Sequence, residues 1–256
     1  MLQKLIRQAI DFQKLDCALA VENLRTGERA SFNQELKVPS ASLIKLLIMA
    51  EIIRQVKAER LDLRRRLTVK AEAKVDYSIL TLLETGNNYS LQDLLTLMIV
   101  QSDNTAANIL IDMVGMDHIN RTCGDLNLSD TILKRKMMDR NAREAGRENY
   151  TSASDMARFL SLLYRGELFD KASSAYMIEI MKKQLESSMI RLYIPDETVI
   201  AHKSGELEGI AHEAGIVFHE KGDYVFVVLT WNAVNNNEAR QTIGQISKLV
   251  YDYFTG

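Results

Sequence analysis

The sequence of 256 residues predicts an α/β protein of the α+β type: an antiparallel sheet built from both termini, flanked by helices, with an inserted all-helical lobe. Three observations predict it. Strand-like runs stand near both termini, the middle repeats apolar residues at helical spacing, and Pro39 and Pro195 flank the helical part. We expect residues 1–40 and 197–256 to form the lobe that holds the sheet, residues 41–196 to form the helical lobe, and a functional cleft to lie between them.

The terminal segments supply the predicted sheet. Residues 17–33 form two strand-like runs about the turn Arg25-Thr26-Gly27. A helix over residues 1–13 is expected before them. The strands expected near the other end are TVIAHKSG (198–205), HEAGIVFHE (212–220) and DYVFVVLTWNA (223–233). A closing helix is expected from about residue 238 to 253, entered through three asparagines that can supply its cap.

The middle of the chain repeats apolar residues at positions i, i+3 and i+4, which indicates helices with one buried face. The first of these helices is expected to begin at Ser42, within VPSASLIKLLIMAEIIRQ (38–55). The others are expected at LQDLLTLMIVQ (91–101), NTAANILIDMV (104–114), SASDMARFLSLLYRG (152–166) and SSAYMIEIMKKQL (173–185).

The composition is that of an ordinary soluble protein, with 46% hydrophobic residues, 26% charged residues and a net charge of −2. This balance, without a basic stripe, argues against a general nucleic-acid binder. Cys17 and Cys123 are expected to be buried free thiols. Because His118, His202 and His219 show no ligand spacing, we expect no metal, and no motif calls for a cofactor.

No apolar stretch is long enough for a membrane segment, and the amino terminus lacks the uninterrupted apolar run of a signal peptide. We therefore expect a cytoplasmic location for the sequence as it stands. If a signal has been removed, the expected location is extracytoplasmic.

Three short motifs carry chemically useful side chains. Ser42 and Lys45 stand three positions apart in one predicted helical turn, so both project from one face. This spacing suits a nucleophile and its base, and it also suits a helix cap followed by a solvated lysine. The motif SDN follows at 102–104, between two predicted helices, and KSG stands at 203–205 on a predicted strand. Each motif alone also fits a plain turn or strand end.

In this order and spacing the three motifs resemble those of the penicillin-recognising serine enzymes, and the chain is most similar to class A β-lactamases. The resemblance runs with little gapping from about residue 17 to the end of the chain. It covers the whole segment MIVQSDNTAANILI and puts Tyr77 where that family has an aromatic gatekeeper. It implies a β-lactamase/transpeptidase-like fold.

The resemblance implies catalytic roles for four residues. Ser42 would be the acylated nucleophile, favoured by the positive end of its helix. Lys45 would be its base, kept neutral part of the time by burial and by the charge of Lys203. Ser102 would relay protons between the two lysines and the leaving nitrogen.

The resemblance also implies contacts with a substrate. Asn104 would hold a substrate amide, and Ser204 with Lys203 would hold a substrate carboxylate. The oxyanion hole would use backbone N–H groups of Ser42 and Glu206. The full set of expected binding residues is Tyr77, Asn104, Ser204, Gly205, Glu206 and His212.

Two of these positions depart from the family pattern. Glu206 stands where a small neutral side chain is usual. Pointing into the cleft, it would repel a substrate carboxylate and tolerate an amine; pointing to solvent, it would matter little. His212 stands where many class A enzymes have an arginine for that carboxylate, and a histidine is a weaker partner near pH 7. A strand histidine satisfied by local hydrogen bonds is the alternative.

The largest departure concerns deacylation. Class A β-lactamases carry the pattern R-x-E-x-x-x-N, whose glutamate activates the water that frees the acyl-enzyme. Here Arg135 is followed by Met137 at the glutamate position and by Asn141. A methionine cannot accept a proton, so deacylation is expected to be slow. Asp139, Glu144 or Glu148 could compensate in a rebuilt loop.

The sequence therefore predicts a serine hydrolase that forms an acyl-enzyme at Ser42 with small molecules, either β-lactams or peptide-like amides and esters. It would resemble a small D-Ala-D-Ala-type peptidase or an esterase more than an efficient β-lactamase. An active β-lactamase with a relocated base, Asp139 or Glu144, is one alternative. A covalent β-lactam sensor or sink without turnover is the other.

Overall fold

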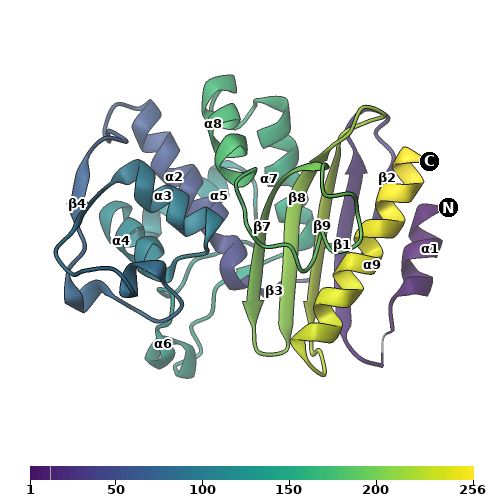
Figure 1. Ribbon diagram of the computed structural model, residues 1–256, viewed down its shortest axis with the longest axis horizontal. Coiled ribbons are helices and arrows are strands. Elements are labelled where there is room, and N and C mark those ends of the chain that lie inside the picture. The colour runs from purple at the N-terminus through teal and green to yellow at the C-terminus, as the bar shows by residue number, and fades with distance from the viewer. Residues whose placement is uncertain (12) are drawn as a thin grey trace.

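A five-stranded antiparallel sheet in the order β2-β1-β9-β8-β7 forms the centre of the computed structural model, which describes residues 1–11 and 13–256 (Figure 1). The first hairpin pairs β1 with β2, and β1 pairs with β9 along its whole length, from Asp16 opposite Trp231 to Asn23 opposite Tyr224. The sheet is thus built from both termini, as predicted. Its strands are β1 (Asp16–Asn23), β2 (Arg29–Phe32), β7 (Val199–Leu207), β8 (Ile210–Phe218) and β9 (Tyr224–Trp231).

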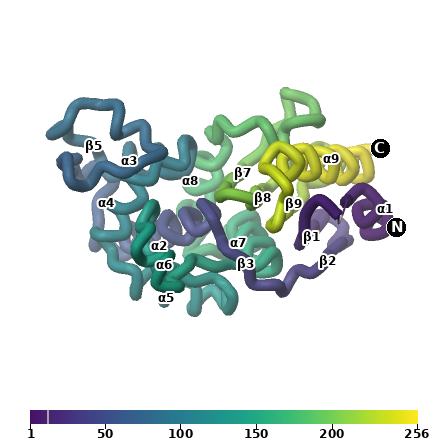
Figure 2. The backbone as a smooth tube through the Cα atoms, turned by 90° about the horizontal axis from the view of Figure 1, so that it is seen from below, coloured from purple at the N-terminus to yellow at the C-terminus, as the bar shows by residue number. Residues whose placement is uncertain are grey.

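Helices cover both faces of this sheet (Figures 1 and 2). α1 (Leu2–Ala9) and α9 (Asn236–Thr255) lie on one face, and α7 (Ala153–Arg165) with α8 (Lys171–Met181) on the other. Because both faces are covered, β9 is apolar and buried along nearly its whole length instead of alternating. The cap predicted for α9 is present: the Asn235 side chain accepts the N–H of Glu238 at 3.0 Å.

Two predicted helices have different bounds. The expected helix over residues 1–13 ends at Ala9, because Ile10 takes an extended conformation. Phe12 lies outside the described residues. The helix expected at 173–185 begins earlier, at Lys171, where the Asp170 side chain caps it, and ends at Met181.

The rest of the inserted segment packs around one buried helix, α2 (Lys45–Lys57), whose first nine residues are all buried. A 3-10 turn, η1 (Ala41–Ile44), leads into α2. The segment also contains α3 (Leu91–Val100), α4 (Asn104–Val114), α5 (Met116–Asp125), α6 (Arg140–Glu144), two short turns η2 (Ala71–Ala73) and η3 (Ile79–Thr81), and the short strands β4 (Arg66–Thr68), β5 (Asn88–Ser90) and β6 (Tyr150–Thr151). Just before the segment, β3 (Val38–Pro39) pairs with β6. Since α7 and α8 contact the sheet, this segment also supplies one layer of the sheet lobe.

The expected state of the two cysteines is confirmed: Cys17 and Cys123 are buried free thiols. Among residues 1–11 and 13–256, no helix is long and apolar enough to cross a membrane. The same residues contain no group of three histidine, cysteine or acidic side chains placed to hold a metal ion.

Candidate active site

Ser42 lies where the chain turns from β3 into α2. The turn is 3-10 rather than α-helical, so Ser42 precedes the first α-helical residue, Lys45. Ala41, directly before Ser42, has φ of +45°, a conformation that costs a residue with a Cβ roughly 1–3 kcal/mol. Ser40 anchors the turn by donating its N–H to the Asn149 carbonyl at 2.8 Å. The surrounding structure therefore holds Ser42 in a strained turn.

Lys45 is fully buried, and its ammonium donates to three acceptors. These are the Ser102 carbonyl, the Ser102 Oγ at 3.1 Å and the Asn104 Oδ1 at 2.7 Å. Burial lowers the pKa of Lys45 well below its ordinary value, the charge of Lys203 lowers it further, and Asp103 acts in the opposite direction. Lys45 can therefore be neutral far more readily than an exposed lysine.

Ser102 joins the two lysines. Its Oγ accepts from Lys45 Nζ and from Lys203 Nζ, each at 3.1 Å. A hydroxyl has two lone pairs and one proton, so these contacts leave its own proton free to donate. Lys203 also donates to the Ser204 carbonyl at 2.7 Å. Within residues 1–11 and 13–256 the Ser42 hydroxyl makes no hydrogen bond. This does not exclude Lys45 as its base, because the bond between a nucleophile and its base is often long before substrate binds.

Asp103 stabilises the turn that carries Ser102 through three hydrogen bonds. It is buried and caps α4, accepting the N–H of Ala106 at 2.8 Å, and it also accepts from Ser78 Oγ at 2.8 Å and the Leu80 N–H at 3.0 Å. The segment that carries Tyr77 is thereby tied to the SDN turn. The Tyr77 ring is 81% exposed, so it stands at the surface beside the site.

Asn104 helps to position the lysine. Its Oδ1 accepts from Lys45 at 2.7 Å, and its Nδ2 donates to the Asp76 carbonyl at 3.0 Å. A side-chain amide nitrogen carries two N–H groups, so the bond to Asp76 leaves one of them for a further acceptor. The expected contact of Asn104 with a substrate amide stays a prediction.

β7 reaches the serine turn at Gly205. A Cβ at this position would lie 2.8 Å from the backbone nitrogen of Ser42 and 3.1 Å from that of Leu43. Such a contact is too short for any side chain, so only glycine lets the strand approach this closely. The approach sets the N–H groups of the turn directly against the strand that carries Lys203 and Ser204.

The Glu206 side chain turns away toward α9. Its carboxylate receives two hydrogen bonds from Arg240, at 2.5 and 2.6 Å. The two side chains are 28% and 34% exposed, so the pair is accessible to water. Neither expectation for Glu206 included this partner.

The expectation that His212 meets a substrate carboxylate is wrong. His212 is fully buried, on the face of β8 that also carries Ala214 and Ile216. Its Nε2 lies 2.8 Å from the Pro39 carbonyl oxygen, and its Nδ1 accepts the Thr230 N–H at 3.2 Å. Burial lowers its pKa, so the ring is a neutral strand histidine with both nitrogens in use.

The loop expected to carry the deacylating group, residues 135–148, has its two ends joined by an ion pair. Arg135 Nε donates to Glu148 Oε1 at 2.9 Å, which joins the two ends of the loop. Met137 is buried, and its backbone is held from both sides by Asn108, which accepts its N–H at 2.8 Å and donates to its carbonyl at 3.0 Å. Asn108 lies one helical turn after Asn104 on α4, so Met137 lies close to the residue that holds Lys45.

None of the carboxylates that could replace the missing glutamate contacts Lys45 or Ser102. Asp139 caps α6 by accepting the Ala142 N–H at 2.9 Å, and Glu148 is paired with Arg135. Glu144 and Asn141 are exposed on α6. The loop is folded, but these side chains are used or placed elsewhere.

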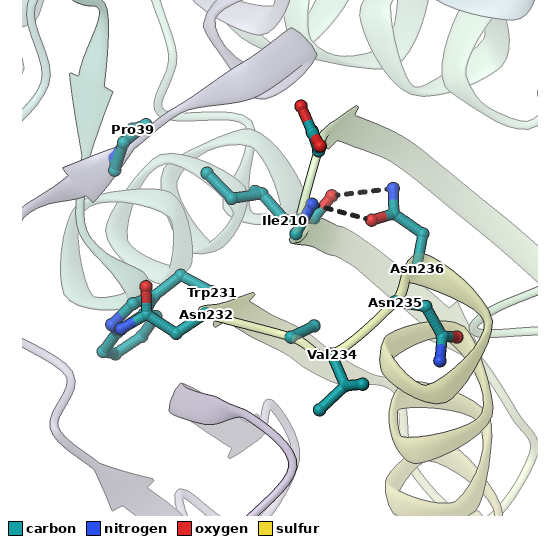
Figure 3. Close-up of a pocket in the computed structure, with 10 residues that line it drawn as sticks. Pro39, Ile210, Trp231, Asn232, Val234, Asn235 and Asn236 are labelled. Carbon is teal, nitrogen blue, oxygen red and sulfur yellow. Dashed lines mark hydrogen bonds between the residues drawn. The ribbon is translucent and has the colours of Figure 1, made fainter.

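A separate groove of about 590 Å³ lies at the end of the sheet (Figure 3). It is lined by Pro39, Ile210, Trp231 and Val234 among others, and Asn236 spans its rim with hydrogen bonds to the backbone of the β7–β8 turn. None of the three motifs contributes to its lining among the described residues, so it is not the site of the serine chemistry.

The family is decided by comparison with known proteins. The sequence profile of the beta-lactamase enzyme family matches residues 1–254. The chain belongs to the β-lactamase family. It is a serine hydrolase of that type, and the similarity predicted from the three motifs is confirmed.

Several known proteins are similar to this chain over most of its length. The β-lactamase of Sphaerobacter thermophilus superposes with a TM-score of 0.93 at 28% identity, over 99% of this chain and 97% of that one. PBP-A superposes with a TM-score of 0.90 at 26% identity, over 99% and 96%. The β-lactamase BRO-1 of Moraxella catarrhalis is 23% identical over 244 residues, 89% of this chain and 76% of its own length.

We expect ligand binding by this β-lactamase-family member to depend on pH through its two buried lysines. Burial lowers the pKa of Lys203 to about 8, although Glu213 and Glu186 act to raise it. Lys203 is therefore a cation below pH 8 and loses its charge above it. In a Ser42→Ala variant, we expect the affinity for benzylpenicillin to fall by about tenfold or more as the pH rises from 6.5 to 9.5.

Titration calorimetry across this range measures the effect. Lys203→Arg serves as the control, because an arginine keeps its charge throughout and any remaining pH dependence then belongs to Lys45. An affinity of the Ser42→Ala variant that stays constant up to pH 9.5 would contradict the prediction.

Proposed function

We propose that the protein forms an acyl-enzyme at Ser42 with β-lactams or peptide-like amides and esters, and that it releases the acyl group slowly. The observation that carries the proposal is the chain of hydrogen bonds Lys45–Ser102–Lys203 beside Ser42, to which no carboxylate of the described residues is bonded. This arrangement has the groups needed to form an ester and lacks the usual group for its hydrolysis.

The acylation step follows from these contacts. A neutral Lys45 takes the proton of the Ser42 hydroxyl while Oγ attacks the substrate carbonyl carbon. The oxyanion lies toward the N–H of Ser42, where Gly205 lets β7 approach, and toward that of Glu206. The proton then passes from Lys45 to Ser102 and from Ser102 to the leaving nitrogen, because Ser102 accepts from Lys45 and keeps a free proton to donate. The scissile bond breaks, and Lys45 is neutral again.

Deacylation needs a base that takes a proton from water. Met137 offers none, and Asp139, Glu144 and Glu148 do not reach the lysine. Among the described residues of the site, neutral Lys45 remains as a base for the second step, which favours slow turnover over efficient β-lactam hydrolysis. PBP-A supports the proposal, since a variant of it has been solved as an acyl-enzyme complex with penicillin G on the same fold at 26% identity.

Intact-protein mass spectrometry tests the proposal. After incubation with benzylpenicillin, we expect an adduct of one intact penicillin that persists for hours and is absent from Ser42→Ala. Rapid loss of penicillin without an adduct would contradict slow release and support an active β-lactamase with a relocated base.

Thioester substrates distinguish a hydrolase from a covalent sink that binds β-lactams without turnover. Turnover of small thioesters by the protein but not by Ser42→Ala supports the hydrolase. A stable adduct without turnover of any ester supports the sink. The absence of both adduct and penicillin loss would remove β-lactams from the substrate class.

A further inference from the structure

Two of the three basic side chains near the substrate-carboxylate end of the site, Arg240 and His212, are already engaged within the protein. Arg240 is held by both oxygens of Glu206, which directly follows Gly205 on β7. His212 is a buried neutral ring with both nitrogens in use. Lys203 differs from Arg240. Among the described residues, it donates to the Ser102 hydroxyl and the Ser204 carbonyl and has no carboxylate bonded to it.

A second carboxylate, Glu186, lies within electrostatic range of both cations. Its Oε1 accepts the N–H and the Oγ of Ser188, each at 2.6 Å, which fixes its position between α8 and β7. Its charge acts to raise the pKa of Lys203 and that of Arg240. A substrate anion at Ser204 would thus meet the negative charge of Glu186 as well as the positive charge of Lys203.

Glu213, on the neighbouring strand β8, adds a further negative charge near Lys203. It is buried on β8, opposite Ser204, and pairs with His202 Nδ1 at 3.0 Å. Lys203 and Arg240 are thus opposed by three carboxylates, those of Glu186, Glu206 and Glu213. Such a balance does not favour a second anion and can accommodate a neutral or cationic group.

We propose that the site selects acyl donors whose leaving group carries an amide, an ester or an amine in place of a free carboxylate, with Glu206 as the residue that determines this preference. The inference rests on the proposed acylation of Ser42 and names the substrate class of that site. Glu206 acts by occupying Arg240, which would otherwise be a second cation for a carboxylate.

Three thioesters with one shared N-benzoylglycyl group test the proposal. Their leaving groups are thioglycolate, thioglycolamide and 2-aminoethanethiol, so they differ in charge at one place. We expect kcat/KM for the amide and the amine to exceed that for the carboxylate by about tenfold. In Glu206→Gln, where Arg240 is released, the ratio of carboxylate to amide is expected to rise by about tenfold.

Glu179→Gln is the matched control, because Glu179 is an exposed residue of α8 paired with Lys182. Its carboxylate-to-amide ratio should equal that of the unaltered protein. A preference of the unaltered protein for the carboxylate thioester would overturn the proposal, and so would a ratio that Glu206→Gln leaves unchanged.

The charge preference can be separated from the acylation chemistry by equilibrium binding. N-benzoylglycylglycine and its amide are titrated into Ser42→Ala, which cannot be acylated at that position. Tighter binding of the amide supports the proposed preference even if no thioester acylates Ser42, a result that would reject the proposed function alone. Tighter binding of the acid overturns the preference.

Discussion

Lys45→Met is expected to lower the second-order rate of Ser42 acylation by about 10²- to 10⁴-fold, the range that a lost general base removes. Lys45 is the buried amine that links Ser42's turn to Ser102 and Asn104. Methionine fills a similar volume but cannot take a proton. It leaves the Ser102 carbonyl and Asn104 Oδ1 without the donor that Lys45 provides, so unfolding should also become easier, by about 1–3 kcal/mol.

The rate is measured by the appearance of the penicillin adduct in the intact mass, and folding by thermal denaturation. Lys57→Met is the matched control, since Lys57 stands at the end of the same helix in an exposed ion pair with Asp170. An acylation rate of Lys45→Met within tenfold of the unaltered protein would assign the base to another group.

Met137→Glu is expected to have the second large effect: it should accelerate deacylation, the step that follows acylation of Ser42. We expect a carboxylate at this position to lie near Asn104 and Lys45, because the loop backbone is bonded to Asn108, one helical turn after Asn104 on α4. It would supply the missing base for water and shorten the lifetime of the penicillin adduct by about 10²- to 10⁴-fold. Burying the new carboxylate should lower stability by a few kcal/mol at most, since Lys45 is near.

Met137→Gln separates the base from the change of shape. Glutamine has the size and polarity of glutamate without its ability to accept a proton from water. The adduct of Met137→Gln should persist as long as that of the unaltered protein. Equal adduct lifetimes in the Glu and Gln variants would show that the loop does not direct residue 137 toward the acyl group.

Local periodicity predicted most of the fold, because helices and strands with one buried face leave a regular pattern. The helix α4 has the predicted bounds, and the strands β7, β8 and β9 were predicted within a few residues. The shortened α1 and the 3-10 turn at Ser42 were not predicted. Both depend on how the chain meets the sheet and β7, which no local pattern records.

The candidate site was predicted only in part. The contacts of Ser102 with Lys45 and Lys203 could be anticipated, because three motifs in one order resemble a known set. The pairing of Glu206 with Arg240 joins positions that have no sequence relation, so it required the structure. His212 could have been placed correctly, since alternation along its strand puts it on the same face as Ala214 and Ile216. Asn108 could have been noticed four positions after Asn104.

The pairing of β1 with β9 has a consequence for biosynthesis. Ser42 emerges early from a ribosome, but the strand that completes its surroundings, β7, and the strand that anchors β1 come from the last quarter of the chain. Contacts between such distant segments form late and slowly. A nascent or truncated chain should therefore expose Ser42 without Lys203 in place, and we expect covalent reactivity toward acyl donors to begin only when synthesis is almost complete.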